Sequence, residues 1–120
     1  MSKKIYVDAF YGQYEDLLQQ MMAVFPEDPD WMRYRTAIAV FRRTNPMMLV
    51  EKTWECVAPY EDAIRTHDEA FFLAQDVAEG PFVHTVAKLR ALWAQLSIHN
   101  RNVVWDYILN ITSLAKRCAA

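Results

Sequence analysis

Apolar residues recur every three or four positions along most of the chain, and prolines and short polar stretches interrupt the pattern. Near the start, Phe10, Tyr14, Leu17 and Met21 follow this spacing. Because an α-helix has about 3.6 residues per turn, the spacing places these side chains along one helical face. The pattern and its interruptions predict helices over about residues 4–24, 29–43, 46–57, 60–66, 68–78, 81–96 and 98–117.

Polar residues that precede these helices have the chemistry of N-caps. Asp28 and Asn45 each come directly before a proline, and proline fits the first helical position, where its missing N–H needs no partner. Ser97 stands in the corresponding place before the last helix. Side-chain oxygens at such positions accept hydrogen bonds from the free N–H groups of the first turn, so we expect all three residues to act as N-caps.

The last helix carries apolar residues on two sides. Val104, Ile108, Ile111 and Ala115 lie on one side, and Val103, Tyr107, Leu114 and Cys118 lie on another. A helix that is apolar on more than one side lies in the middle of a bundle or also contacts a second chain. The sequence therefore predicts an all-α fold, a single compact bundle of about six to seven helices around a long central C-terminal helix, in one domain over residues 1–120.

The composition supports a folded domain and excludes two large classes of nucleotide-binding protein. Apolar residues make up 53% of the chain and charged residues 23%, so there is enough apolar surface to form a core. Only two glycines are present, Gly12 and Gly80, and they are isolated. Rossmann and P-loop sites need closely spaced glycines so that the backbone can approach phosphate groups. Two glycines are also too few for the many turns of a β-sandwich or barrel.

The two cysteines predict a reducing environment rather than a disulfide framework. Cys56 lies in an apolar run and is expected to be a small core residue, whereas Cys118, near the end, is expected in a frayed terminus. The basic start of the chain leads into polar and acidic residues and lacks the pattern of a signal peptide. No apolar run approaches the roughly 18 residues of a membrane span. We expect an intracellular protein that does not enter a membrane.

No motif predicts catalysis, a cofactor or a metal site. His67, His84 and His99 are not spaced to share a helical face with one another or with a cysteine. The acidic stretch 27–30 lacks the spacing of a calcium loop and fits the first turn of a helix. Adjacent acids elsewhere in the chain point about 100° apart on a helix and do not form a catalytic pair. The expectation is a non-enzymatic protein without a cofactor or metal ion.

Charge is sorted into blocks along the chain, although the net charge is only −2. Residues 5–32 carry six acids and no base, and residues 33–50 carry four arginines and no acid. Arginines beside aromatic residues are typical of phosphate binding, but also of pairing with acidic helices of the same chain. The acidic net charge argues against tight nucleic-acid binding. Both interpretations stay open for Arg33, Arg35, Arg42 and Arg43.

Methionines and the two-sided last helix favour contact with another protein. Methionine and aromatic residues are enriched at protein interfaces, and both members of a methionine doublet cannot easily face one core. The leading hypothesis is a protein-binding domain that acts as a homodimer, with its interface at Met47, Met48, Val103, Tyr107 and Leu114. The alternative is a nucleic-acid-associated accessory protein that uses the arginine-rich second helix.

Four segments also carry a family resemblance through their order and spacing. They are FPED at 25–28, NP at 45–46 with Trp54 in the helix that follows, DEAFFL at 68–73 and WDYILNITSL at 105–114. Over about residues 25–115 the chain resembles a group of short helical proteins encoded by large nucleocytoplasmic DNA viruses of protists, the marseillevirus-like viruses among them. The resemblance implies an infected host cell as the setting, in the cytoplasm, virus factory or nucleus. It implies no role for any residue.

Overall fold

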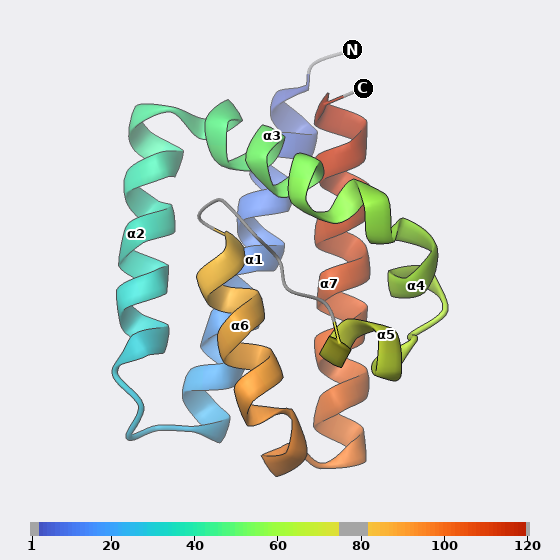
Figure 1. The fold of residues 1–120 in the computed structure, drawn as a ribbon. Helices are drawn as coiled ribbons and strands as arrows, with labels where there is room; N and C mark the ends of the chain where they lie inside the picture. Colours follow the sequence, from blue (N-terminus) through green and yellow to red (C-terminus); the bar gives the residue numbers. More distant parts are fainter. Residues whose placement is uncertain (1–2, 75–81, 120) are drawn as a thin grey trace.

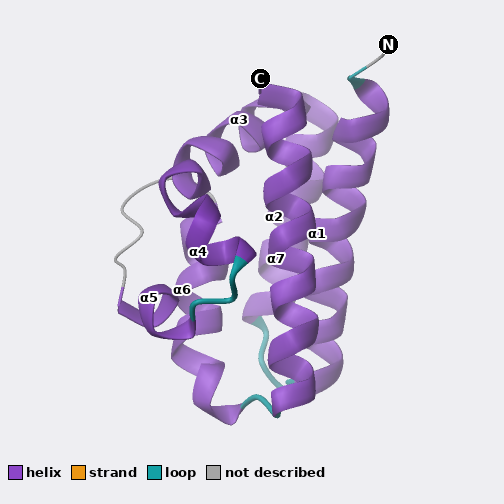
Figure 2. Ribbon diagram, turned by 90° about the vertical axis from the view of Figure 1, so that its right-hand side faces the viewer, coloured by secondary structure: helices purple, strands orange, loops and turns teal. Residues whose placement is uncertain are grey.

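The computed structural model describes residues 3–74 and 82–119, which form only helices and short connections (Figure 1, Figure 2). The radius of gyration is 13.6 Å, as expected for a compact chain of this length. The predicted all-α bundle is therefore confirmed. The α-helices are α1 (Lys4–Val24), α2 (Asp30–Thr44), α3 (Pro46–Val57), α4 (Glu61–Arg65), α5 (Glu69–Ala74), α6 (Phe82–Leu92) and α7 (Ile98–Ala119), and the 3-10 helices are η1 (Ala58–Tyr60) and η2 (Trp93–Gln95).

The two longest helices, α1 and α7, lie side by side and run in opposite directions (Figure 1). The regularly spaced apolar face of α1 is buried in this arrangement, and Phe10 and Leu17 have no exposed surface. The Asn110 side chain of α7 donates a hydrogen bond of 3.1 Å to Gln13 of α1. α7 also contacts α3 and α4, so the C-terminal helix is central, as the two-sided apolar pattern predicts.

The remaining helices are arranged around this pair. α3 crosses the end of the bundle where α1 begins and α7 ends, α6 packs against α3, and α2 lies at the outside (Figure 1). Two tyrosines of α1 donate or share hydrogen bonds with these neighbours. The Tyr11 hydroxyl donates to the Pro46 carbonyl at 2.6 Å, and the Tyr14 hydroxyl lies 2.6 Å from the Thr85 hydroxyl of α6.

Most predicted helix boundaries lie within one or two residues of the observed ones. α1 and α3 match the predicted ranges, and α2 is one residue later at both ends. The region predicted as helix over 60–66 divides into η1 and α4, and the helix predicted to end at 96 finishes as the 3-10 turn η2. The predicted end at residue 78 and start at residue 81 lie outside the described residues.

Two of the three predicted N-caps make the expected side-chain bond. Ser97 Oγ accepts an N–H of the first turn of α7 at 3.1 Å, and Asp28 Oδ1 accepts the N–H of Asp30 at 3.0 Å. Asn45 occupies the cap position of α3, but its side chain makes no cap bond, so that prediction is wrong. Its backbone oxygen instead accepts the N–H of Met48 at 3.2 Å, which already satisfies a free donor of the first turn.

α4 ends at a residue with left-handed backbone geometry. His67 has φ 55°, a conformation that favours glycine, and its N–H bonds to Ile64 while the next N–H bonds to Ala63. This pair of bonds is a Schellman motif, which satisfies the last carbonyls of a helix. The imidazole stacks on the Trp105 ring of α7, with centroids 5.1 Å apart and planes 6° from parallel. That contact helps His67 to hold a conformation in which a side chain is otherwise unfavourable.

Lys88 of α6 is bound by the acidic turn that precedes α2. Its Nζ lies 2.7 Å from a carboxylate oxygen of Asp28 and 2.8 Å from one of Asp30. The hydrogen bonds from the ammonium lower the pKa of Asp28, and the two carboxylates raise the pKa of Lys88. The acids predicted as first-turn partners of a helix therefore also anchor α6 to the start of α2.

Of the two cysteines, Cys118 lies in a different environment from the predicted one, and Cys56 packs against the core as a partly buried residue. Cys118 is fully buried, because α7 continues to Ala119 and keeps this residue on its inner side, one turn beyond the buried Ala115. Cys56 is only half-buried. The terminal residue of the pair is thus the more deeply buried one, and the frayed terminus expected at Cys118 does not occur.

Burial on α7 can be tested with one residue type at two positions. We expect Ile111→Ala to lower the free energy of unfolding by about 2–5 kcal/mol, because a fully buried side chain is replaced by a cavity. Ile98→Ala on the same helix is the control, since Ile98 is 77% exposed, and its effect should stay within about 0.5 kcal/mol. Urea unfolding followed by circular dichroism measures both. An equal loss of unfolding free energy in the two variants would contradict the orientation of α7 in the structure.

Candidate functional site

α2 lies at the edge of the bundle and leaves one face uncovered (Figure 1). Of its residues only Trp31 and Ile38 are buried. On the other side Met32 is 49% exposed and Val40 is 43% exposed. Together with the polar residues between them, these side chains form what we call the α2 outer face. Its members follow helical spacing: Met32, Arg35, Thr36, Ala39, Val40 and Arg43.

The first two predicted arginines of α2 bind neighbours within the chain. Arg33 forms an ion pair with Asp30, one turn earlier on the same helix, at 3.3 Å. Arg35 donates a hydrogen bond of 3.0 Å to the side-chain oxygen of Gln19 on α1. Both side chains stay largely exposed, so these contacts contribute little to stability.

Arg42 and Arg43 point to different surroundings. Arg42 lies 3.1 Å from a carboxylate oxygen of Glu15, and its guanidinium stands over the Tyr11 ring at 5.7 Å. Arg43 is exposed, and no ion pair to it occurs among the described residues. The four arginines therefore do not converge on one site, and the internal pairing considered from the charge blocks accounts for Arg33 and Arg42.

The predicted methionine doublet is divided between two environments. Met48 is 36% exposed on the first turn of α3. Met47 is half-buried and packs against the core, where it lines a groove with Val7 of α1 and with Lys3, which precedes that helix. One methionine of the pair is therefore turned toward the surface.

The other predicted interface residues lie on α7 and are not fully exposed. Tyr107 and Leu114 are half-buried and pack against the core, and Val103 is half-buried. Burial and the nearby Asp16 carboxylate of α1 raise the pKa of Tyr107. The second apolar side of α7 is therefore partly covered within the chain, and it offers less area to another chain than the sequence pattern alone suggests.

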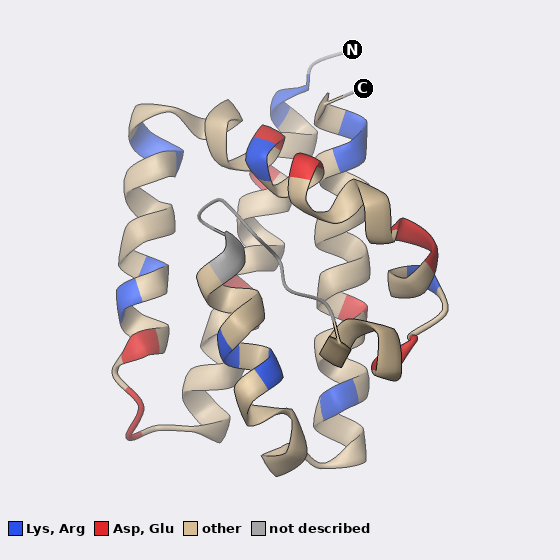
Figure 3. Cartoon of the chain, in the orientation of Figure 1, with Lys and Arg blue, Asp and Glu red and all other residues tan. Residues whose placement is uncertain are grey.

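Cations from three parts of the sequence meet at one end of the bundle (Figure 3). The first turn of α1 carries lysine, and the last turns of α2 and α7 carry arginine. Some of these charges are paired, since Lys4 lies 2.7 Å from Asp8 and Lys116 lies 2.8 Å from Glu61. Sequence reasoning missed this grouping, because its members are up to a full chain length apart.

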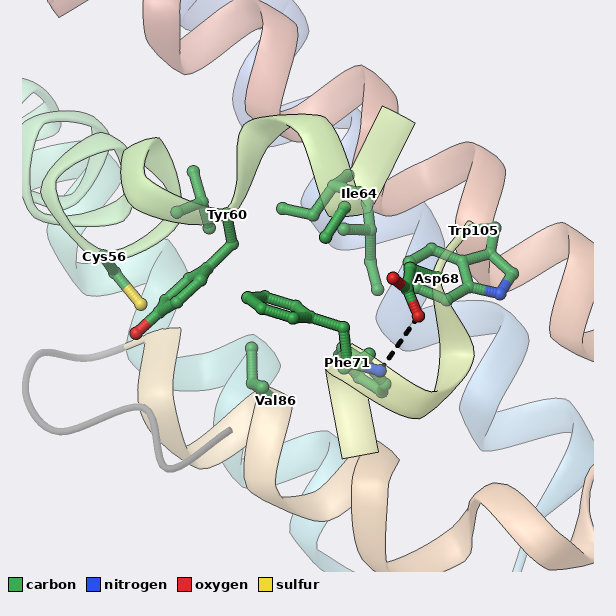
Figure 4. Close-up of a pocket in the computed structure, with 11 residues that line it drawn as sticks. Cys56, Tyr60, Ile64, Asp68, Phe71, Val86 and Trp105 are labelled. Carbon is green, nitrogen blue, oxygen red and sulfur yellow. Dashed lines mark hydrogen bonds between the residues drawn. The ribbon is translucent and has the colours of Figure 1, made fainter. Parts of the chain in front are cut away.

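An apolar pocket opens between α3, α4, α5 and α7 (Figure 4). Trp105 and Ile108 of α7 and Ile64 of α4 are buried in its wall. The rings of Tyr60 and Phe71 lie opposite each other at 5.6 Å between centroids. The remaining members of the wall are Cys56, Val57, Ala63, Asp68, Phe72 and Val86. Sequence reasoning did not find this pocket, because it depends on how two short helices pack on α7.

Asp68 and Cys56, two polar residues of the pocket, do not have the features of catalytic groups. The Asp68 carboxylate accepts the N–H of Phe71 at 3.0 Å and so caps α5 (Figure 4). Burial raises the pKa of the Cys56 thiol to about 11. Nucleophilic cysteines instead have a lowered pKa, which leaves the thiolate present at neutral pH. Cys56 is therefore a protonated thiol under those conditions.

Comparisons with known proteins add no relative to this description. The chain matches no family model, no curated protein and no solved structure. Within the described ranges no group of three or more histidine, cysteine or acidic side chains is placed to hold a metal ion. None of the helices in those ranges combines the length and apolar character needed to cross a lipid bilayer.

The raised pKa of Cys56 predicts slow alkylation. In the Cys118→Ala variant, where Cys56 is the remaining thiol, iodoacetamide at pH 8 should react more slowly than with a thiol of pKa 9.0, because the thiolate fraction is about a hundredfold smaller. The rate should climb as the pH approaches 11, because the thiolate is the reactive form. The same variant unfolded in urea is the control and should react at the ordinary rate. A folded-state profile with its midpoint at or below 9 would contradict the assignment.

Proposed function

We propose that this chain is a non-enzymatic, protein-binding helical domain that acts as a homodimer, with the α2 outer face as the contact between copies. The main observation that supports this proposal is that Met32 and Val40 are exposed on a helix that buries only two residues. Methionine and arginine are enriched in protein interfaces, and the α2 outer face combines both with the small residue Ala39. The small side chain allows another helix to approach closely.

An antiparallel pairing of two α2 helices gives the contact an apolar centre. If a two-fold axis passes beside Thr36, Met32 of one copy comes opposite Val40 of the other, because each lies four residues from Thr36. The same match repeats on the other side of the axis. Two apolar contacts then flank a central pair of threonines, whose hydroxyls already bond to their own helix, as Thr36 does to the Met32 carbonyl at 2.9 Å.

The same pairing makes opposite charges meet at both ends. Arg43 lies seven residues beyond Thr36 and comes level with Pro29 of the second copy, beside the acidic turn 27–30. Within that turn Asp28 and Asp30 are bound to Lys88, whereas Glu27 is exposed. An Arg43–Glu27 pair between copies therefore uses two charges that form no described ion pair within one copy. Such rim pairs contribute more to orientation than to affinity.

Three further points support a binding role over catalysis and suggest a setting. The pocket thiol is protonated at neutral pH. The Asp68 carboxylate is engaged as a helix cap. The resemblance of residues 25–115 to proteins of large DNA viruses suggests that the dimer works within an infected cell.

Light scattering at micromolar protein tests the dimer. We expect a mass twice the 14.1 kDa of one chain, unchanged in high salt because salt does not screen an apolar centre. Val40→Glu should give monomer, since it buries a charge at the contact. Ile98→Glu, at an exposed apolar residue on α7, is the matched control and should remain a dimer.

A charge exchange tests the orientation of the two helices. Arg43→Glu alone should weaken the dimer, and Arg43→Glu combined with Glu27→Arg should restore it, because the pair is then reversed rather than lost. A wild-type mass of 14.1 kDa that does not change with concentration would contradict the homodimer. Failure of the double variant to recover would contradict the antiparallel arrangement.

A second candidate function, nucleic-acid association, rests on the cations at one end of the bundle. Lys3, Arg43 and Arg117 carry no described ion pair and come from the ends of three helices (Figure 3). It has weaker support, because Arg42 is paired with Glu15 and the whole chain is acidic. Binding to a DNA or RNA oligonucleotide that falls steeply with salt, and is lost when Lys3, Arg43 and Arg117 are all changed to Ala, would favour this alternative.

A further inference from the structure

The apolar pocket beneath α4 and α5 has the construction of a small ligand site. It encloses a cavity of about 40 Å³, which is more than the roughly 10–15 Å³ that one water molecule needs. Its inner wall consists of Val57, Ile64, Val86 and Ile108, which are nearly fully buried, and the Trp105 ring. Apolar cavities of this kind stay dry, because water finds no hydrogen-bonding partners in them.

The outer wall of the pocket is a cap of two short helices. α4 has five residues and buries only Ile64, and α5 has six and buries none fully. Helices of this length are not stable on their own. The cap is held to α7 by the stacking of His67 on Trp105 and by ion pairs of Glu61 and Glu69 with Lys116 and Arg101. Segments with few buried contacts open at a lower free-energy cost than the core does.

Size and polarity together define what the cavity accepts. About 40 Å³ is roughly a quarter of a cavity that holds benzene, so the closed pocket admits a group of a few heavy atoms. An anion is disfavoured there because the Asp68 carboxylate at the edge is negative, and an ion of either sign loses its hydration against a wall that is otherwise apolar. We propose that this pocket binds a small, uncharged molecule through a short alkyl end.

Residues at the mouth of the pocket would contact the part of the ligand beyond its alkyl end. The rings of Tyr60 and Phe71 are in contact there, with centroids 5.6 Å apart, so they cover this side of the cavity with apolar surface (Figure 4). The protonated Cys56 thiol and the Tyr60 hydroxyl lie at the same side of the pocket in this view. A ligand with one hydroxyl beyond its alkyl end therefore meets neutral polar groups where the pocket ends.

NMR of methyl groups in the full chain tests the proposal with defined probes. Xenon and 1-butanol should each cause saturable shifts of the Ile64, Ile108 and Val57 methyl signals, and the shifts should be absent from Ile98, which is exposed on α7. Butyrate has the same chain length but a charge, and it should cause no saturable shift. Shifts that rise linearly with 1-butanol, or equal shifts with butyrate, would overturn the proposal.

A variant with a smaller cavity distinguishes binding in the pocket from general effects of the added solvent. Ala63→Leu places added methyl groups in the wall and should weaken 1-butanol binding about tenfold or more. Ala70→Leu, an exposed position on the same cap, is the matched control and should bind as the unmodified chain does. Ala63→Val is the milder variant if Ala63→Leu does not fold. Unchanged binding in a folded Ala63 variant, confirmed by its thermal transition, would show that the probe binds elsewhere.

Discussion

The antiparallel contact between α1 and α7 is the interaction on which the rest of the molecule depends. Both helices span the length of the bundle, and their inner faces supply a large part of the buried core (Figure 1). Since α7 is apolar on two sides, it can contact α3 and α4 on one side while α1 covers the other. This accounts for the burial of Cys118 next to the end of the chain.

The same contact determines which surfaces are left over. Tyr107 and Leu114 pack against the core within one chain, whereas α2 at the edge of the bundle carries two exposed large apolar side chains on one face, Met32 and Val40. The short helices α4 and α5 are added to the outside of α7 and do not fill the space beneath them. The proposed contact between copies and the proposed ligand pocket thus lie on different elements, and either can be changed without altering the other.

The sequence predicts the helices and the central place of α7 because periodicity is a local property of the chain. It does not predict partners across the fold. Arg42 meets Glu15 and Lys88 meets Asp28 only after distant segments pack together. Asn45 loses its predicted cap bond because the backbone satisfies the first turn of α3. The pocket also escapes prediction, since residues 58–74 have short, irregular helices whose packing on α7 no sequence spacing encodes.

The central claim is that the apolar sides of α7 pack mainly within one chain, and that the proposed contact between copies lies on α2. Disulfide crosslinking tests it most directly, in a background with Cys56→Ser and Cys118→Ala. A cysteine at Thr36 lies beside the proposed two-fold axis and meets its own copy within disulfide range, whereas one at Val103 on α7 does not. The account predicts that oxidised Thr36→Cys runs as a covalent dimer on a non-reducing gel and that Val103→Cys remains a monomer. Crosslinking through Val103→Cys with none through Thr36→Cys would contradict it.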